Sequence, residues 1–194
     1  MIHVRRGDVR VAREVVDRHA DVGLSGNIEF AQGYAAVDAA VLAAEGRHED
    51  AFRQALRALS EPVSAWWVYF HVLDVAAALP DAHAAQELVA RADETTRGKR
   101  WAVVDAQAAR LRARLPEHDS IAELEESERR FRDLEVPFHT AVAQAERAEH
   151  LIAAGRLDEG REFLAEARHT FERLRARPWL ERVDAALGRE QVVA

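Results

Sequence analysis

The sequence predicts an all-α protein, arranged as a right-handed α-solenoid of antiparallel helix hairpins with about ten helices. Apolar residues recur at helical spacing along the chain, as where Leu164, Ala167 and Phe171 follow one another at steps of three and four. The segment LAAEGRHEDA (42–51) returns as LIAAGRLDEG (151–160), which indicates an internal repeat. No stretch alternates apolar and polar residues with β-branched enrichment, so no strand is expected.

Prolines and glycines divide the chain into these helices. Proline costs about 3 kcal/mol inside a helix, so the five prolines are interpreted as helix starts or boundaries. Gly46, Gly98, Gly155 and Gly188 each follow an apolar-periodic run, where a left-handed C-cap is favoured. The predicted helices span 8–21, 28–45, 47–59, 63–79, 81–97, 99–115, 119–134, 137–154, 158–175 and 178–187.

The repeated segment explains how the helices pair. LAAEGR and LIAAGR each end one helix, turn at the glycine and lead into a helix whose first turn is acidic, which suits the helix dipole. One hairpin cannot bury its apolar faces alone, so hairpins are expected to stack. The prediction is one helical repeat domain over 1–194, with a half repeat at 1–21, pairs at 28–59, 63–97, 99–134 and 137–175, and a capping helix at 178–188.

Composition excludes several classes of protein. The 194 residues carry a formal charge of −7, which disfavours nucleic-acid binding by this segment. The absence of cysteine excludes disulfides, thiolate metal sites and cysteine nucleophiles. No apolar run is long enough for a membrane span and no signal peptide is evident, so a cytoplasmic protein is expected. Arginine supplies all positive charge except Lys99, a bias typical of GC-rich bacteria.

The hairpin pattern resembles the tetratricopeptide repeat, a unit of two antiparallel helices. With Gly46 on the turn glycine of that family, Ala39, Ala51 and Ala58 fall on its small-residue positions, and Ala85 begins a second copy. The segment GDVRVAREVV near the N-terminus matches the turn and second helix of a repeat without its first helix, which favours a piece cut from a longer protein. The resemblance implies a superhelix whose groove binds extended partners.

Residues 131–188 carry a closer resemblance. FRDLEVP (131–137) recurs as FERLRARP (171–178), and the region is similar to the C-terminal repeats of MalT-like, LuxR-type regulators and of actinobacterial multidomain nucleotide cyclases. Gly160 and Arg175 depart from that pattern, which usually has alanine and glycine there. No phosphate-binding loop, cyclase segment or DNA-binding helix-turn-helix is present, so the resemblance transfers no ATPase, cyclase or DNA-binding residue to this chain.

An aromatic segment, SAWWVYFHVLD (64–74), is the first candidate binding surface. On a helix, Trp67, Phe70, His71 and Asp74 share a face that the repeat register places in the groove of the solenoid. Large rigid aromatic residues are frequent at the energetic centres of interfaces. The alternative is that this face is buried between neighbouring repeats.

Three acids lie within otherwise apolar helices: Asp38, Asp74 and Asp105. Such a carboxylate needs a partner if it is buried. One hypothesis is an acidic stripe along the groove that accepts an arginine- or amine-bearing ligand. The alternative is that each acid pairs with an arginine from its own or a neighbouring helix.

No catalytic or metal-binding pattern emerges, and no cofactor is expected. The nine histidines are scattered without ligand spacing, and the serines have no nucleophile motif around them. The predicted function is a non-catalytic protein–protein interaction or regulatory module of a larger bacterial signalling or transcriptional regulator, with a protein or peptide segment as partner. The alternatives are a small-ligand sensor of the same fold controlling a linked effector domain, and a helical enzyme or metal protein. The sequence indicates no oligomeric state.

Overall fold

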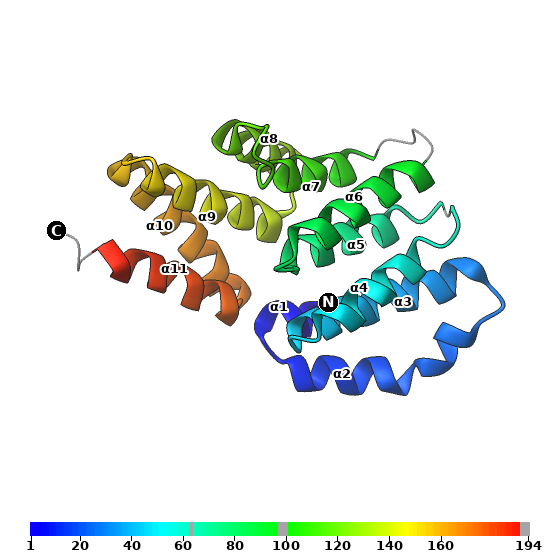
Figure 1. The fold of residues 1–194 in the computed structure, drawn as a ribbon. Coiled ribbons are helices and arrows are strands. Elements are labelled where there is room, and N and C mark those ends of the chain that lie inside the picture. The colour runs from blue at the N-terminus through cyan, green and yellow to red at the C-terminus, as the bar shows by residue number, and fades with distance from the viewer. Residues whose placement is uncertain (63, 97–100, 191–194) are drawn as a thin grey trace. The chain divides into compact units, whose positions relative to one another are not determined.

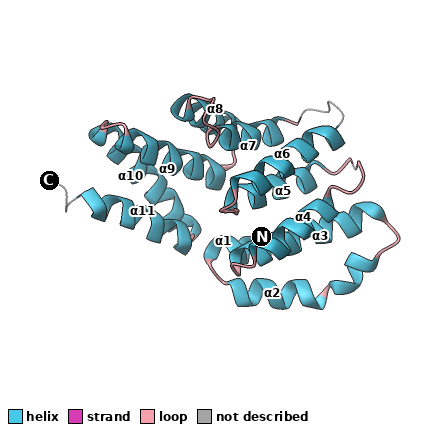
Figure 2. Ribbon diagram, viewed as in Figure 1, coloured by secondary structure: helices cyan, strands magenta, loops and turns pink. Residues whose placement is uncertain are grey.

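The computed structural model describes residues 1–62, 64–96 and 101–190, and all secondary structure in these ranges is helical (Figures 1 and 2). The all-α prediction is therefore confirmed for the described chain. Eleven α-helices and one 3₁₀ helix, η1, occur in this order: α1 Ile2–Arg6, α2 Val9–Arg18, η1 Ala20–Leu24, α3 Ile28–Ala44, α4 His48–Ala58, α5 Trp66–Ala78, α6 Ala82–Thr96, α7 Ala102–Arg112, α8 Ser120–Asp133, α9 Pro137–Ala153, α10 Leu157–Leu174 and α11 Arg177–Glu190.

The helix ends follow the turn residues. Gly46 and Gly155 adopt φ of 77° and 81°, and the amides of Arg47 and Arg156 bond to the carbonyls of Leu42 and Leu151 at 2.9 Å. These bonds, which span five residues, make both turns Schellman caps. At the other end of α3, the side chain of Asn27 accepts from the amides of Glu29 and Phe30, as Asp119 does for α8.

Three predicted details differ from the structure. The sequence does not predict α1 or η1, both five residues long. The C-cap predicted at Gly188 is wrong, because Gly188 lies inside α11. That helix continues because Val183 and Ala186 stay packed in the core on its apolar face, which offsets the cost of an internal glycine, about 1 kcal/mol. The cap at Gly98, the predicted helix ends at 97 and 99, and the predicted start at 63 fall outside the described residues.

The chain forms two compact units, Met1–Gln107 and Ala108–Ala194. In the first unit α3 is central and packs against α2, α4 and α5. Ala35, Ala39, Ala51 and Ala55 are fully buried, so small side chains let the helix backbones approach closely. Larger residues fill the space further out, where Tyr69 stacks on Trp101 with ring centroids 5.4 Å apart.

In the second unit α9 is central and packs against both α8 and α10, while α11 packs on α10. The core contains Phe138 and Phe171 among buried alanines, and Trp179 stacks on Phe171 at 5.5 Å. Arg112 and Glu123 form an ion pair of 2.9 Å that joins the end of α7 to the start of α8. Within this unit α9 therefore lies between α8 and α10.

Candidate functional site

The structure gives Asp38 an arginine partner within the first unit. The carboxylate of Asp38 is 2.7 Å from Arg13 of α2, which also binds Glu45 at 2.9 Å. The hydrogen bonds that Arg13 donates to Glu45 and to Asp38 raise the pKa of Arg13, and Arg13 in turn lowers the pKa of Glu45. Asp38 is thus buried as part of an ion-pair cluster, which is the alternative that the sequence left open for it.

Asp74 also has a hydrogen-bond partner and an ionic partner within the first unit. Its carboxylate accepts a hydrogen bond from Nε2 of the buried Gln107 at 2.9 Å, and Arg5 of α1 lies 3.9 Å away. Burial lowers the pKa of Arg5, and Asp74 partly opposes this effect. Asp105 lies in the first turn of α7 and is half-buried. An acidic ligand-binding stripe through these three residues remains a prediction.

The predicted aromatic face lies close to other helices of the first unit. Trp67 of α5 is half-buried with its ring directly against Gly33 of α3. Phe70 is 5% exposed, and its ring is 5.7 Å from that of the half-buried His71. Trp66 remains 44% exposed beside Phe70. A binding role for this face remains a prediction, and the burial of Phe70 fits the packing alternative.

A small polar pocket of about 270 Å³ lies over α2, α3 and α4. Asp38 lines it together with Arg13, Leu42, Arg47, Asp50, Arg53 and Gln54. The three guanidinium groups are already paired, because Arg13 binds Asp38 and Glu45, while Arg47 and Arg53 both bind Asp50. A ligand that used these cations would have to displace existing ion pairs.

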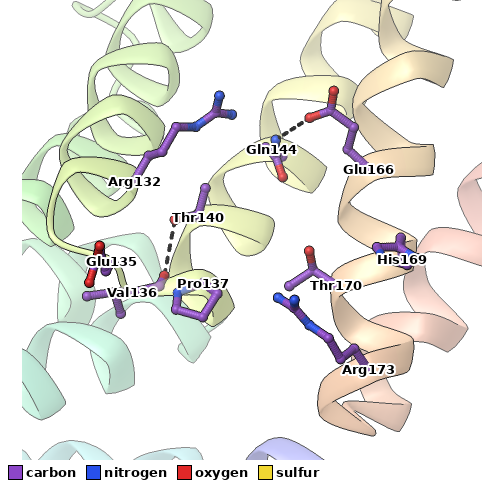
Figure 3. A pocket seen from close by; sticks show the side chains of 10 residues that line it. All are labelled: Arg132, Glu135, Val136, Pro137, Thr140, Gln144, Glu166, His169, Thr170 and Arg173. Atoms are coloured by element: carbon purple, nitrogen blue, oxygen red, sulfur yellow. Dashed lines mark hydrogen bonds between the residues drawn. The ribbon is translucent and has the colours of Figure 1, made fainter.

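A larger groove of about 760 Å³ lies over α9 in the second unit, and we call it the α9 groove (Figure 3). Its floor comes from α9, and α8 and α10 form its walls. The residues that line it are Arg132, Glu135, Val136, Pro137, Thr140, Gln144, Glu166, His169, Thr170 and Arg173.

The floor of the α9 groove is polar because one face of α9 carries Pro137, Thr140 and Gln144 at helical spacing. The hydroxyl of Thr140 donates to the carbonyl of Val136 at 3.1 Å. Gln144 is 4% exposed and donates to Glu166 of α10 at 2.7 Å (Figure 3). It also donates to Glu128 of α8 at 3.2 Å. One buried amide therefore bridges three helices at the base of the groove.

Ion pairs hold the wall formed by α8. The buried carboxylate of Glu128 binds Arg132 on its own helix and Arg147 of α9, the latter at 3.2 Å. Arg147 also binds Glu125 at 3.0 Å and lies 4.5 Å from the ring centre of Phe163. These contacts fix α8 against α9, so this side of the groove is formed before any partner arrives.

The rim of the α9 groove carries charges without partners. Among the residues that the structure describes, no side-chain hydrogen bond or ion pair involves Glu135, His169 or Arg173. Glu135 and Arg173 are exposed, and they come from the turn before α9 and the last turn of α10. Glu135 holds a left-handed conformation with φ 54°, which ends α8 and turns the chain into α9. Such charges are available to an incoming partner.

The α9 groove is not predicted by the helical periodicity of the sequence. That periodicity marks the apolar face of α9, where Ala141, Ala145 and Ala148 pack in the core. The available signal was Gln144 in AVAQAERA, a polar residue within an alanine-rich run. Asp38 was selected as a polar residue within an otherwise apolar helix, YAAVDAAV, and Gln144 meets the same criterion.

Within residues 1–62, 64–96 and 101–190, no cluster of three or more histidines and carboxylates is arranged to hold a metal ion. No helix in the described part of the chain combines the length and apolar character that crossing a bilayer requires. No protein-family model matches the chain, and neither do the curated proteins or solved structures with which it was compared.

Proposed function

We propose that this chain is a non-catalytic protein-binding module of a larger bacterial signalling or transcriptional regulator, and that the α9 groove is its binding surface. The observation that carries the proposal is the groove itself, with its volume of about 760 Å³, a fixed polar floor and unpartnered charges on its rim. A groove already held by ion pairs and hydrogen bonds binds without first ordering its own walls, which favours affinity.

The proposed architecture is a tetratricopeptide-like, right-handed solenoid. The recurrence of one turn geometry supports it. Gly7, Gly46 and Gly155 all have left-handed φ, and each follows a helix that ends in the same five-residue hydrogen-bonded turn. Glu135 and Arg175 repeat the geometry with φ of 54° and 57° in FRDLEVP and FERLRARP. The wider regulatory role rests on the resemblance of residues 131–188 alone.

A small-ligand sensor is the second candidate, and the polar pocket beside Asp38 favours it. The pocket is about 270 Å³, large enough for a small polar molecule. Its guanidinium groups are already paired with carboxylates, whereas Glu135 and Arg173 on the rim of the α9 groove have no side-chain partner among the described residues. A thermal-shift screen against nucleotides and sugars tests this candidate, because a ligand of the folded state raises Tm by an amount that increases with the ratio of its concentration to its dissociation constant.

Selection from a displayed library of random peptides tests the proposal for the α9 groove. Peptides enriched on the wild-type chain should bind it when binding is measured by fluorescence anisotropy. They should bind the Thr170→Trp variant at least tenfold more weakly, which is a loss of binding free energy on the order of 1.4 kcal/mol. The indole of this variant would fill the groove from its α10 wall. Glu181→Trp on the exposed side of α11 is the matched control and should bind normally. Enriched peptides that bind wild type and Thr170→Trp equally would contradict the proposal.

A further inference from the structure

The amide of Gln144 can take only one orientation in its site. Both hydrogens of its nitrogen are donated to carboxylates, Glu166 at 2.7 Å and Glu128 at 3.2 Å. A carboxylate oxygen accepts hydrogen bonds, so an amide turned the other way would set its oxygen against two acceptors. The neighbours of Gln144 therefore leave its oxygen, Oε1, as the atom that is free for the groove (Figure 3).

This oxygen lines the α9 groove and lacks a donor among the described residues. Gln144 is 4% exposed as a whole residue, and no residue in the described ranges donates to its oxygen. An amide oxygen only accepts hydrogen bonds, so a donor that enters the groove can bind it and an acceptor cannot. The site therefore selects for a hydrogen-bond donor.

The atoms around Gln144 also favour a hydrogen-bond donor in the groove. Thr140 gives its hydroxyl hydrogen to the carbonyl of Val136, so its oxygen is left to accept. Glu166 uses one carboxylate oxygen for Gln144 and retains the other, together with its negative charge. Of the two arginines that line the groove, Arg132 binds Glu128, and Arg173 lies two turns from Glu166 along α10, about 10 Å by helix rise.

We propose that this part of the α9 groove binds the arginine side chain of a partner segment; the inference rests on the proposed protein-binding function. A guanidinium carries five donors in a plane and no acceptor, so it satisfies the amide oxygen of Gln144 and the carboxylate of Glu166 together. Its charge also balances Glu166, which among the described residues is bound only to the neutral amide of Gln144.

A pair of capped pentapeptides tests the proposal by NMR titration of the whole chain. The first is acetyl-Ala-Ala-Arg-Ala-Ala-amide, and the second replaces arginine with citrulline, which has nearly the same shape but no charge. The arginine peptide should produce saturable shifts at Thr140, Gln144 and Thr170, and the citrulline peptide should bind at least tenfold more weakly, since hydrogen bonds to charged groups are the stronger class. Glu166→Gln should weaken arginine-peptide binding to a similar extent, while Glu181→Gln on α11, which removes the same charge elsewhere, should not.

Three results of this titration would overturn the inference: equal affinity for both peptides, full affinity in a folded Glu166→Gln variant, or no saturable shift in the groove at arginine-peptide concentrations on the order of 10 mM. These failures can be told apart from failure of the proposed function. Library peptides that bind the α9 groove without any basic residue would overturn the arginine inference and leave the protein-binding function intact. If no library peptide binds the groove, both are contradicted.

Discussion

At the scale of single residues, Gly33 governs how closely α3 and α5 approach. A Cβ atom added at Gly33 would overlap the ring of Trp67, which lies directly over the glycine. Overpacking of this kind costs about 1–3 kcal/mol. Gly33→Ala should therefore lower the free energy of unfolding by about that amount in urea titrations. Gly26→Ala, where nothing lies within 4 Å, is the control and should change it far less.

A second substitution identifies the cause of the Gly33 effect. Replacing Trp67 with leucine in the Gly33→Ala background should recover part of the lost stability, because the clash is with the indole ring. If the effects of the two substitutions on the free energy of unfolding simply added, the close packing of Trp67 on α3 would not be the cause of the Gly33→Ala destabilisation.

Arg175 carries backbone strain that a glycine would relieve. It ends α10 with φ 57° and ψ 39°, the left-handed region that costs a residue with a Cβ about 1–2 kcal/mol. Arg175→Gly should raise the free energy of unfolding by about 0.5–1 kcal/mol, after the greater entropy of glycine in the unfolded chain is subtracted. Gly155→Ala, at φ 81°, is the reciprocal variant and should destabilise the protein in the same assay.

At the scale of elements, the Arg110–Glu146 ion pair joins α7 to α9. Two hydrogen bonds of 2.6 and 2.7 Å link the side chains, and Arg110 is buried. Burial alone would raise the pKa of Glu146, but the nearby Arg110, and Arg182 more weakly, bring the net pKa below its ordinary value of 4.5. The charged form of Glu146 is therefore favoured by folding.

The Arg110–Glu146 ion pair predicts that the protein loses stability as the solution becomes acidic. Its contribution to stability should be complete above the ordinary carboxylate pKa of 4.5 and should fall as pH drops through the lower pKa of the folded protein. Glu146→Gln should destabilise the protein at neutral pH by about 2 kcal/mol, because the buried guanidinium of Arg110 loses the carboxylate charge that it binds at 2.6 and 2.7 Å. In denaturant titrations, the free energy of unfolding of the variant should also change less than that of the wild type between about pH 5 and pH 3.

Glu159→Gln is the matched control for the pH experiment. Glu159 pairs with Arg156 on the surface, where solvent screens the interaction. The Glu159→Gln substitution should leave both the stability at neutral pH and the loss of stability in acid nearly unchanged. An equal loss of acid dependence in both variants would contradict the special role of the buried pair.

Local turn chemistry made the elements predictable from sequence. LAAEGR and LIAAGR contain the glycine and the flanking helical periodicity that a Schellman cap requires, so the turns at Gly46 and Gly155 could be predicted. Gly188 shows the limit of this reasoning, because a glycine alone does not end a helix whose apolar face remains packed. The short helix α1 escaped prediction because five residues contain too little periodicity to detect.

At the scale of the whole molecule, the candidate site depended on information that no single helix contains. The partners of Asp38 and Asp74 come from other helices, Arg13 on α2 and Gln107 on α7, and helical periodicity does not specify such pairings. The α9 groove likewise needs α8 and α10 on either side of α9. The polar residue Gln144 was visible in the sequence, but its role follows only from Glu128 and Glu166 on the neighbouring helices.

The central claim is that the α9 groove binds a protein segment, and hydrogen exchange with a library-selected peptide tests it most directly. Amide exchange would be followed by mass spectrometry over the whole chain, with and without saturating peptide. Binding should slow exchange in the segments that form the groove, the end of α8 with the turn to α9 and the facing parts of α9 and α10. Protection confined to residues of the first unit, Met1–Gln107, with exchange in α9 and α10 unchanged, would contradict the claim.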